Sequence, residues 1–85
     1  MKVKIELEPS KSPFRLFYFA SKIGDRVELL GDISNGPDNG YEVYLQFLTG
    51  ERAFKYAATL LEATKIIEKE TLFLYNIRTE SNVER

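Results

Sequence analysis

The fold of this chain is decided by residues 12–24, SPFRLFYFASKIG. Ser12 followed by Pro13 is typical of a helix start, because serine caps free N–H groups and proline fits the first helical turn. Gly24 would end such a helix in the left-handed conformation. The aromatic run at 17–19 favours a strand instead, with a two-residue hairpin turn starting at Gly24. The helical signals outnumber the strand signal, so the sequence favours a helix over 13–23 and leaves a strand as the alternative.

Alternation of apolar and polar residues predicts strands on both sides of this stretch. Residues 2–8 place Val, Ile and Leu on one face and charged residues on the other, and Pro9 ends the run. Residues 26–33 and 41–48 show the same two-residue period. Between them, residues 34–40 are rich in Gly, Asn, Asp and Pro, which is typical of a turn.

The second half of the chain is predicted to hold a helix and a last strand. Residues 50–69 follow Thr49, which can cap a helix, and their apolar residues recur with a helical period. That apolar stripe consists of Ala53, Phe54, Ala57, Leu60, Leu61, Thr64 and Ile67. Residues 71–78 are apolar on both faces and predict a buried strand.

The resulting order is β-α-β-β-α-β, the ferredoxin-like arrangement, with two helices on one face of a four-stranded antiparallel sheet. The alternative is a four-stranded meander followed by one helix and a fifth strand. Either arrangement is α+β, with a single domain over residues 1–79 and a polar C-terminal tail over 80–85.

Composition narrows the function classes. The 85 residues include no His and no Cys, so the usual general base, the strongest common nucleophile and the usual zinc ligands are missing. We therefore expect no enzyme, no metal and no cofactor. The formal net charge is −1, whereas nucleic-acid binders usually carry a basic excess. No apolar run reaches the ~20 residues of a membrane span, and the first residues lack the apolar core of a signal peptide, so we expect a cytoplasmic protein.

The predicted sheet has one face that its helices leave open. Alternation places Lys2, Lys4, Glu6, Glu28, Leu30, Tyr44, Gln46 and Leu48 on it, with part of 72–77. Such a half-apolar face is typical of a contact surface. The sequence thus predicts a non-catalytic interaction or assembly module that binds a second copy or a larger protein. The expected contact residues are Tyr44, Leu48, Phe73 and Tyr75, with Ile66 on the helix.

Two alternative functions stay open at this stage. If residues 13–23 are helical, the helix N-terminus beside Ser10, Lys11, Ser12 and Arg15 could hold a phosphate or another anion. A weak RNA-binding domain would instead use aromatic and basic side chains of the sheet, above all Lys2, Lys4 and Tyr44.

The opening residues 4–8, Lys-Ile-Glu-Leu-Glu, with Pro-Ser close behind, resemble the start of the small dimerisation subunits of the archaeal and eukaryotic KEOPS tRNA-modification complex. The later strand, the turn at 49–50 and an alanine-rich helix are similar too. The resemblance implies a non-catalytic subunit that dimerises and bridges larger ones. The chain departs from that family at residues 59–62, Thr-Leu-Leu-Glu, and in the predicted strand after the helix.

Overall fold

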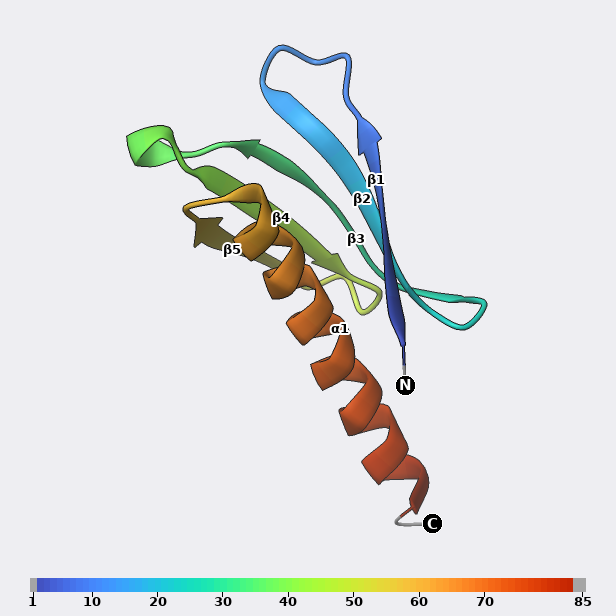
Figure 1. The fold of residues 1–85 in the computed structure, drawn as a ribbon. Coiled ribbons are helices and arrows are strands. Elements are labelled where there is room, and N and C mark those ends of the chain that lie inside the picture. Colours follow the sequence, from blue (N-terminus) through green and yellow to red (C-terminus); the bar gives the residue numbers. More distant parts are fainter. Residues whose placement is uncertain (1, 84–85) are drawn as a thin grey trace.

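The computed structural model describes the chain over residues 2–83, and the surroundings of its side chains as far as residue 76. Five antiparallel strands form one sheet in the order β1-β2-β3-β4-β5, and a long C-terminal helix crosses one face of that sheet (Figure 1). The elements are β1 (Val3–Pro9), β2 (Arg15–Ile23), β3 (Arg26–Asn35), a 3-10 turn (Pro37–Asn39), β4 (Tyr41–Phe47), β5 (Arg52–Ala57) and α1 (Leu60–Val83).

The expected ferredoxin-like arrangement is therefore wrong. The described residues contain one α-helix rather than two, and all five strands follow one another in a meander. The alternative arrangement was right about the first four strands and wrong about the order of the last strand and the helix. The strands expected at 2–8, 26–33 and 41–48 are confirmed with small differences at their ends, because their alternation matches the two faces of the sheet.

The helix expected over 13–23 is strand β2. The serines before it serve a hairpin loop rather than a helix: Ser10 Oγ accepts a hydrogen bond from the Ser12 N–H, and Ser12 Oγ accepts one from the Phe14 N–H. Such local bonds favour turns as readily as helix caps. Gly24 has a φ of 60°, so its left-handed conformation turns the β2–β3 hairpin instead of ending a helix.

The helix expected over 50–69 begins ten residues later. Residues 52–57 form β5, and α1 starts after Thr59, whose Oγ1 accepts a hydrogen bond from the Glu62 N–H at 3.1 Å. The Glu62 carboxylate in turn accepts a bond from the Ala58 N–H at 2.9 Å. This close variant of the reciprocal capping box marks the true helix start.

The strand expected over 71–78 is also wrong, because α1 continues through these residues to Val83. Thr71 and Leu74 follow Ile67 at helical spacing and bring the same helix face onto the sheet. The helix also takes up residues 80–83 of the predicted tail, while residues 84 and 85 lie outside the described part.

The hydrophobic core lies between α1 and the inner face of the sheet. Its fully buried side chains come from β3, β4 and α1 and are Leu29, Ile33, Val43, Leu45, Ala63 and Ile67. Burying one such aliphatic side chain contributes roughly 1.5–3 kcal/mol. One buried polar contact accompanies them, a hydrogen bond between the hydroxyls of Ser21 on β2 and Thr71 on α1. Thr71 donates to the Ile67 carbonyl at 2.8 Å, so both hydroxyls have partners.

The expected alternation fails around Glu28 in β3. Glu28 was expected on the open face, yet its side chain is fully buried. Ser21 pairs with Leu29 whereas Lys22 pairs with Val27, so the register shifts and Glu28 is the extra residue of a β-bulge. Its Oε1 lies 3.8 Å from Nε of Arg26, so the buried carboxylate has a basic partner.

No helix among the described residues combines the length and the apolar character that a bilayer crossing requires.

Candidate functional site

The outer face of the sheet, opposite α1, is the candidate site. Strand register identifies its residues, because directly paired residues point to the same face. Tyr18 of β2 lies opposite Asp32 of β3, Asp32 opposite Tyr44 of β4, and Tyr44 opposite Phe54 of β5. One row across four strands is thus mainly aromatic. No described helix covers this face (Figure 1).

We define the aromatic patch as Tyr18, Leu30, Tyr44 and Phe54. The rings of Tyr44 and Phe54 make a tilted contact with centroids 5.1 Å apart. Phe54 is 57% exposed and Leu30 45%, although both side chains are large and apolar. A shallow hollow of about 250 Å³ lies between Tyr18, Leu30 and Tyr44. Exposed apolar side chains that gather on one face make it a candidate binding surface.

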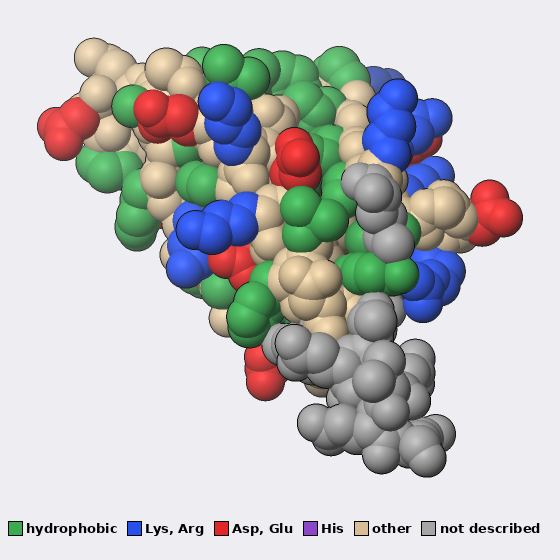
Figure 2. Space-filling view, turned by 60° about the horizontal axis from the view of Figure 1, so that its bottom comes forward, with side chains coloured by type: hydrophobic (Ala, Val, Ile, Leu, Met, Phe, Trp, Pro, Cys, Tyr) green, Lys and Arg blue, Asp and Glu red, His purple; other side chains and the backbone are tan. Residues whose placement is uncertain are grey.

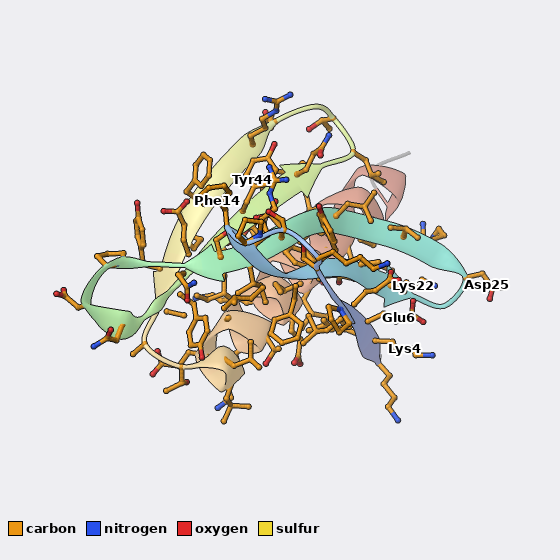
Figure 3. The ribbon with its side chains drawn as sticks, turned by 90° about the horizontal axis from the view of Figure 1, so that it is seen from above. Lys4, Glu6, Phe14, Lys22, Asp25 and Tyr44 are labelled. Carbon is orange, nitrogen blue, oxygen red and sulfur yellow. The ribbon has the colours of Figure 1, made fainter. Side chains whose placement is uncertain are left out.

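A second, wider groove of about 680 Å³ borders the patch. Its lining includes Phe14, which is 80% exposed, and Tyr44, and Figure 3 shows these two side chains on the same part of the sheet. Arg15 closes one side through an ion pair of its Nε with Asp32 at 3.3 Å. Ser34 donates a hydrogen bond to the same carboxylate at 3.2 Å. The groove therefore combines aromatic rings with the ion pair of Arg15 and Asp32, and Glu42 and Arg52 also line it.

The charges on the open face are balanced. The strands place four basic and four acidic side chains on it: Lys4, Arg15, Lys22, Arg52, Glu6, Glu8, Asp32 and Glu42. Three of the basic groups form ion pairs, namely those of Lys4 and Lys22 with Glu6 and that of Arg15 with Asp32. On the side that Figure 2 shows, basic and acidic groups are likewise interspersed rather than gathered into one basic area.

The residues predicted for partner contact divide between the two sides of the molecule. Tyr44 lies on the open face as expected, while Leu48 lies in the β4–β5 turn and is 57% exposed. Phe73, Tyr75 and Ile66 belong to α1 rather than to the sheet. Phe73 is 58% exposed there, Ile66 packs against the core, and the ring of Tyr75 lies 5.9 Å from the guanidinium of Arg26.

Sequence reasoning missed Phe54 and Tyr18 as members of the patch. Phe54 was assigned to the buried stripe of a helix, and Tyr18 to a helix over 13–23. The missed signal was alternation within residues 52–57, where Arg52, Phe54 and Tyr56 share the outer face while Ala53 and Ala57 turn inward.

The residues predicted to hold an anion lie in the β1–β2 hairpin loop and at the start of β2. The helix N-terminus on which that site depended is not there, since Arg15–Ile23 form a strand. The two serine hydroxyls accept hydrogen bonds from the loop's own N–H groups, and Arg15 is paired with Asp32. Lys11 is exposed beside them. The RNA-binding alternative combined Lys2 and Lys4 with the ring of Tyr44. Strands β2 and β3 lie between Lys4 and Tyr44, which places the two residues roughly 14 Å apart at normal strand spacing.

The carboxyl group of Glu6 lies within ion-pair distance of two lysines. Hydrogen bonds from Lys22 at 3.0 Å and, to a lesser extent, from Lys4 at 3.4 Å lower its pKa below the ordinary value of 4.5. Figure 3 shows the three side chains together at the start of β1.

We expect the replacement Lys22→Met to raise the pKa of Glu6 towards 4.5. Because the pKa in the folded state is depressed, ionised Glu6 stabilises the fold above its unfolded-state pKa, and this contribution is lost as pH falls through the folded-state value. An NMR titration of the Glu6 carboxyl carbon measures the effect. Lys11→Met is the control and should leave the Glu6 titration unchanged. If the Glu6 titration were also unchanged in Lys22→Met, Lys22 would not be what lowers the pKa of Glu6.

Among the described residues no group of three or more acidic side chains is arranged to hold a metal ion. Searches of protein-family models, of curated proteins and of solved structures find no match for this chain.

Proposed function

We propose that this chain is a non-catalytic interaction module that binds another protein through the open face of its sheet. The observation that supports this is the aromatic patch, in which the rings of Tyr18, Tyr44 and Phe54 lie in one row with no described helix above them. Tyr18 and Phe54 are exposed and Tyr44 is half-buried. Rings held by a sheet lose little conformational freedom on binding, so they contribute favourably to an interface.

The balance of charge favours a protein as the partner. A nucleic-acid surface needs basic groups that are free to neutralise phosphates, and here Lys4, Arg15 and Lys22 are already paired with carboxylates. A protein interface, in contrast, commonly has an apolar centre and a rim of both charges. The patch fits that centre, and Arg15, Asp32, Glu42 and Arg52 fit the rim.

The replacement Tyr44→Glu tests the proposal. A carboxylate in the middle of the patch would be desolvated on binding, so we expect the affinity for the partner to fall by roughly 30-fold, the scale of an interface hot spot. The partner is first isolated from the host with tagged wild-type chain, then purified, and the affinity of each variant is measured by calorimetry. Circular dichroism confirms that the variant is folded.

The matched control is Phe73→Glu, because Phe73 is as exposed as Phe54 but lies on α1. This variant should bind the purified partner with wild-type affinity. Equal binding by Tyr44→Glu and wild type, or a loss confined to Phe73→Glu, would contradict the proposal.

A further inference from the structure

Strand β1 is an edge of the sheet, since β2 is its one neighbour among the described strands. In an antiparallel pair, alternate residues direct both backbone hydrogen-bonding groups to the neighbour, and the residues between them direct both groups outwards. The Ser10 N–H donates to the Leu16 carbonyl at 2.9 Å, in continuation of the β1–β2 register. Even-numbered residues of β1 therefore bond to β2, and Val3, Ile5 and Leu7 present free N–H and C=O groups at the edge.

The side chains of this edge have an order that is complementary to itself. Residues 2–8 read KVKIELE, with both lysines before both glutamates on the outer face and three aliphatic residues on the inner face. Suppose a second β1 lies antiparallel alongside with Ile5 opposite Ile5. Lys4 then faces Glu6, Lys2 faces Glu8, and Val3 faces Leu7 on the core side. Cross-strand pairs of opposite charge and of aliphatic residues are both favourable.

Other pairings lack this match. Shifting the register by two residues places Lys4 opposite Lys4 or Glu6 opposite Glu6 and keeps two opposite-charge pairs instead of four. Parallel in-register pairing puts like charges together. A shift of one residue would turn the aliphatic side chains to the wrong face. The other edge, β5, carries only basic charges, Arg52 and Lys55, and offers no opposite-charge pair to a copy of itself. Charged side chains on an edge strand usually oppose pairing with another strand. On β1, however, the lysines precede the glutamates, and this order turns the same charges into matching pairs.

The exposure of these residues agrees with an edge that has room for a second strand. The side chain of Lys4 is 74% exposed and that of Glu6 is 44% exposed. Val3, Ile5 and Leu7 are only half-buried, although Ile5 and Leu7 pack against the core. A paired β1 would cover the outer rim of these three aliphatic side chains. Glu6 would lie between Lys22 of its own chain and Lys4 of the second copy.

We propose that the chain forms a two-fold symmetric dimer in which two β1 strands pair antiparallel about Ile5 and join the sheets into one of ten strands. Three hydrogen-bonded residue pairs would supply roughly six backbone bonds. The interface is closed, because the β1 edge of each copy is covered by the β1 edge of the other, so no further copy can add there. Both aromatic patches then lie on the same side of the joined sheet. This dimer uses the edge and not the open face, so its failure would leave the proposed function standing.

A charge exchange within β1 tests the dimer. Lys4→Glu and Glu6→Lys each create two like-charge pairs in the symmetric interface, so each should raise the dimer dissociation constant on the order of tenfold or more. The double variant Lys4→Glu/Glu6→Lys restores opposite charges in the same register and should recover the wild-type constant. Sedimentation equilibrium of the purified full chain measures all four proteins, and circular dichroism verifies folding.

Disulfide trapping tests the register independently of those charges. The chain has no cysteine, so single replacements report without background. In the proposed register residues 4 and 6 form a non-hydrogen-bonded pair with Cα atoms about 4.5 Å apart, which a disulfide can bridge. Mixing Lys4→Cys chains with Glu6→Cys chains under mild oxidation should give mainly the mixed disulfide, which mass spectrometry separates from the two symmetric products.

Lys55→Glu on β5, which lies outside the aromatic patch and its rim, is the control and should leave the dissociation constant unchanged. Three results would overturn the dimer: a monomeric wild type at millimolar concentration, a double variant no tighter than the single variants, or symmetric disulfides in excess of the mixed one. A dimer that is lost in Tyr44→Glu but retained in Lys4→Glu would instead place self-association on the open face.

Discussion

Replacing Gly31 with alanine is expected to destabilise the fold by about 3 kcal/mol or more, which is a large part of the ~4–13 kcal/mol typical of a domain of this size. A Cβ atom at Gly31 would lie 1.8 Å from the backbone carbonyl oxygen of Tyr44 and 2.8 Å from the Phe19 ring. The ring could turn away, but the carbonyl belongs to the paired strand β4 and cannot move without breaking the ladder. Chemical denaturation monitored by circular dichroism measures the loss.

The matched control is Gly24→Asn in the β2–β3 turn. Gly24 has a left-handed φ of 60°, and a Cβ atom there would have no neighbour within 4 Å. Asparagine tolerates the left-handed conformation better than most residues. This variant should lie close to the wild type in its free energy of unfolding. If Gly31→Ala were as stable as Gly24→Asn, the close approach of β3 and β4 would be refuted.

Replacing Ile67 with alanine is expected to lower the free energy of unfolding by about 2–5 kcal/mol. Ile67 is fully buried between α1 and the sheet, where it belongs to the same cluster as Leu29 and Leu45. Its removal would leave a cavity at the centre of the one contact between helix and sheet. Denaturant unfolding again measures the loss. The dependence of the free energy of unfolding on denaturant concentration should stay as in the wild type.

Leu61→Ala provides the comparison on the same helix. Leu61 is 65% exposed, so its truncation should cost no more than about 0.5 kcal/mol. Similar losses for the two variants would mean that α1 does not present the face containing Ile67 to the sheet.

Three strands could be predicted from the sequence because each has one covered and one solvated face. In β1 and β4 the two-residue alternation is uninterrupted, and the buried positions Val43 and Leu45 follow from it. The same alternation placed Tyr44 on the open face correctly. It failed at Glu28, because a bulge adds one residue to β3 and no local feature of the sequence announces it.

Strand β2 could not be separated from a helix by local signals. The Ser-Pro start and the Gly24 end suit either a capped helix or a strand between two turns. What decides is the long-range pairing of Phe19 with both Leu7 and Gly31, which a single stretch of sequence does not contain. The glycine opposite the ring is part of that decision, since a larger residue there would meet the backbone of β4.

The last third of the chain was predicted wrongly for a different reason. Ala53, Ala57 and Leu60 have helical spacing, but they belong to β5 and to the start of α1. The Thr-Leu-Leu-Glu run at 59–62 is a capping-box pattern followed by an apolar helix face, and it could have shown where the helix begins. Given that start, residues 71–78 continue the helix without a break.

Site-specific photo-crosslinking at Phe54 distinguishes the open face of the sheet from the helix as the surface that contacts another protein. Phe54 and Phe73 are 57% and 58% exposed, so the same photoreactive phenylalanine analogue can replace either one with equal access. With the partner purified, we expect one discrete adduct from position 54, its loss when Tyr44→Glu is added, and none from position 73. An adduct from position 73 with none from position 54 would contradict this expectation.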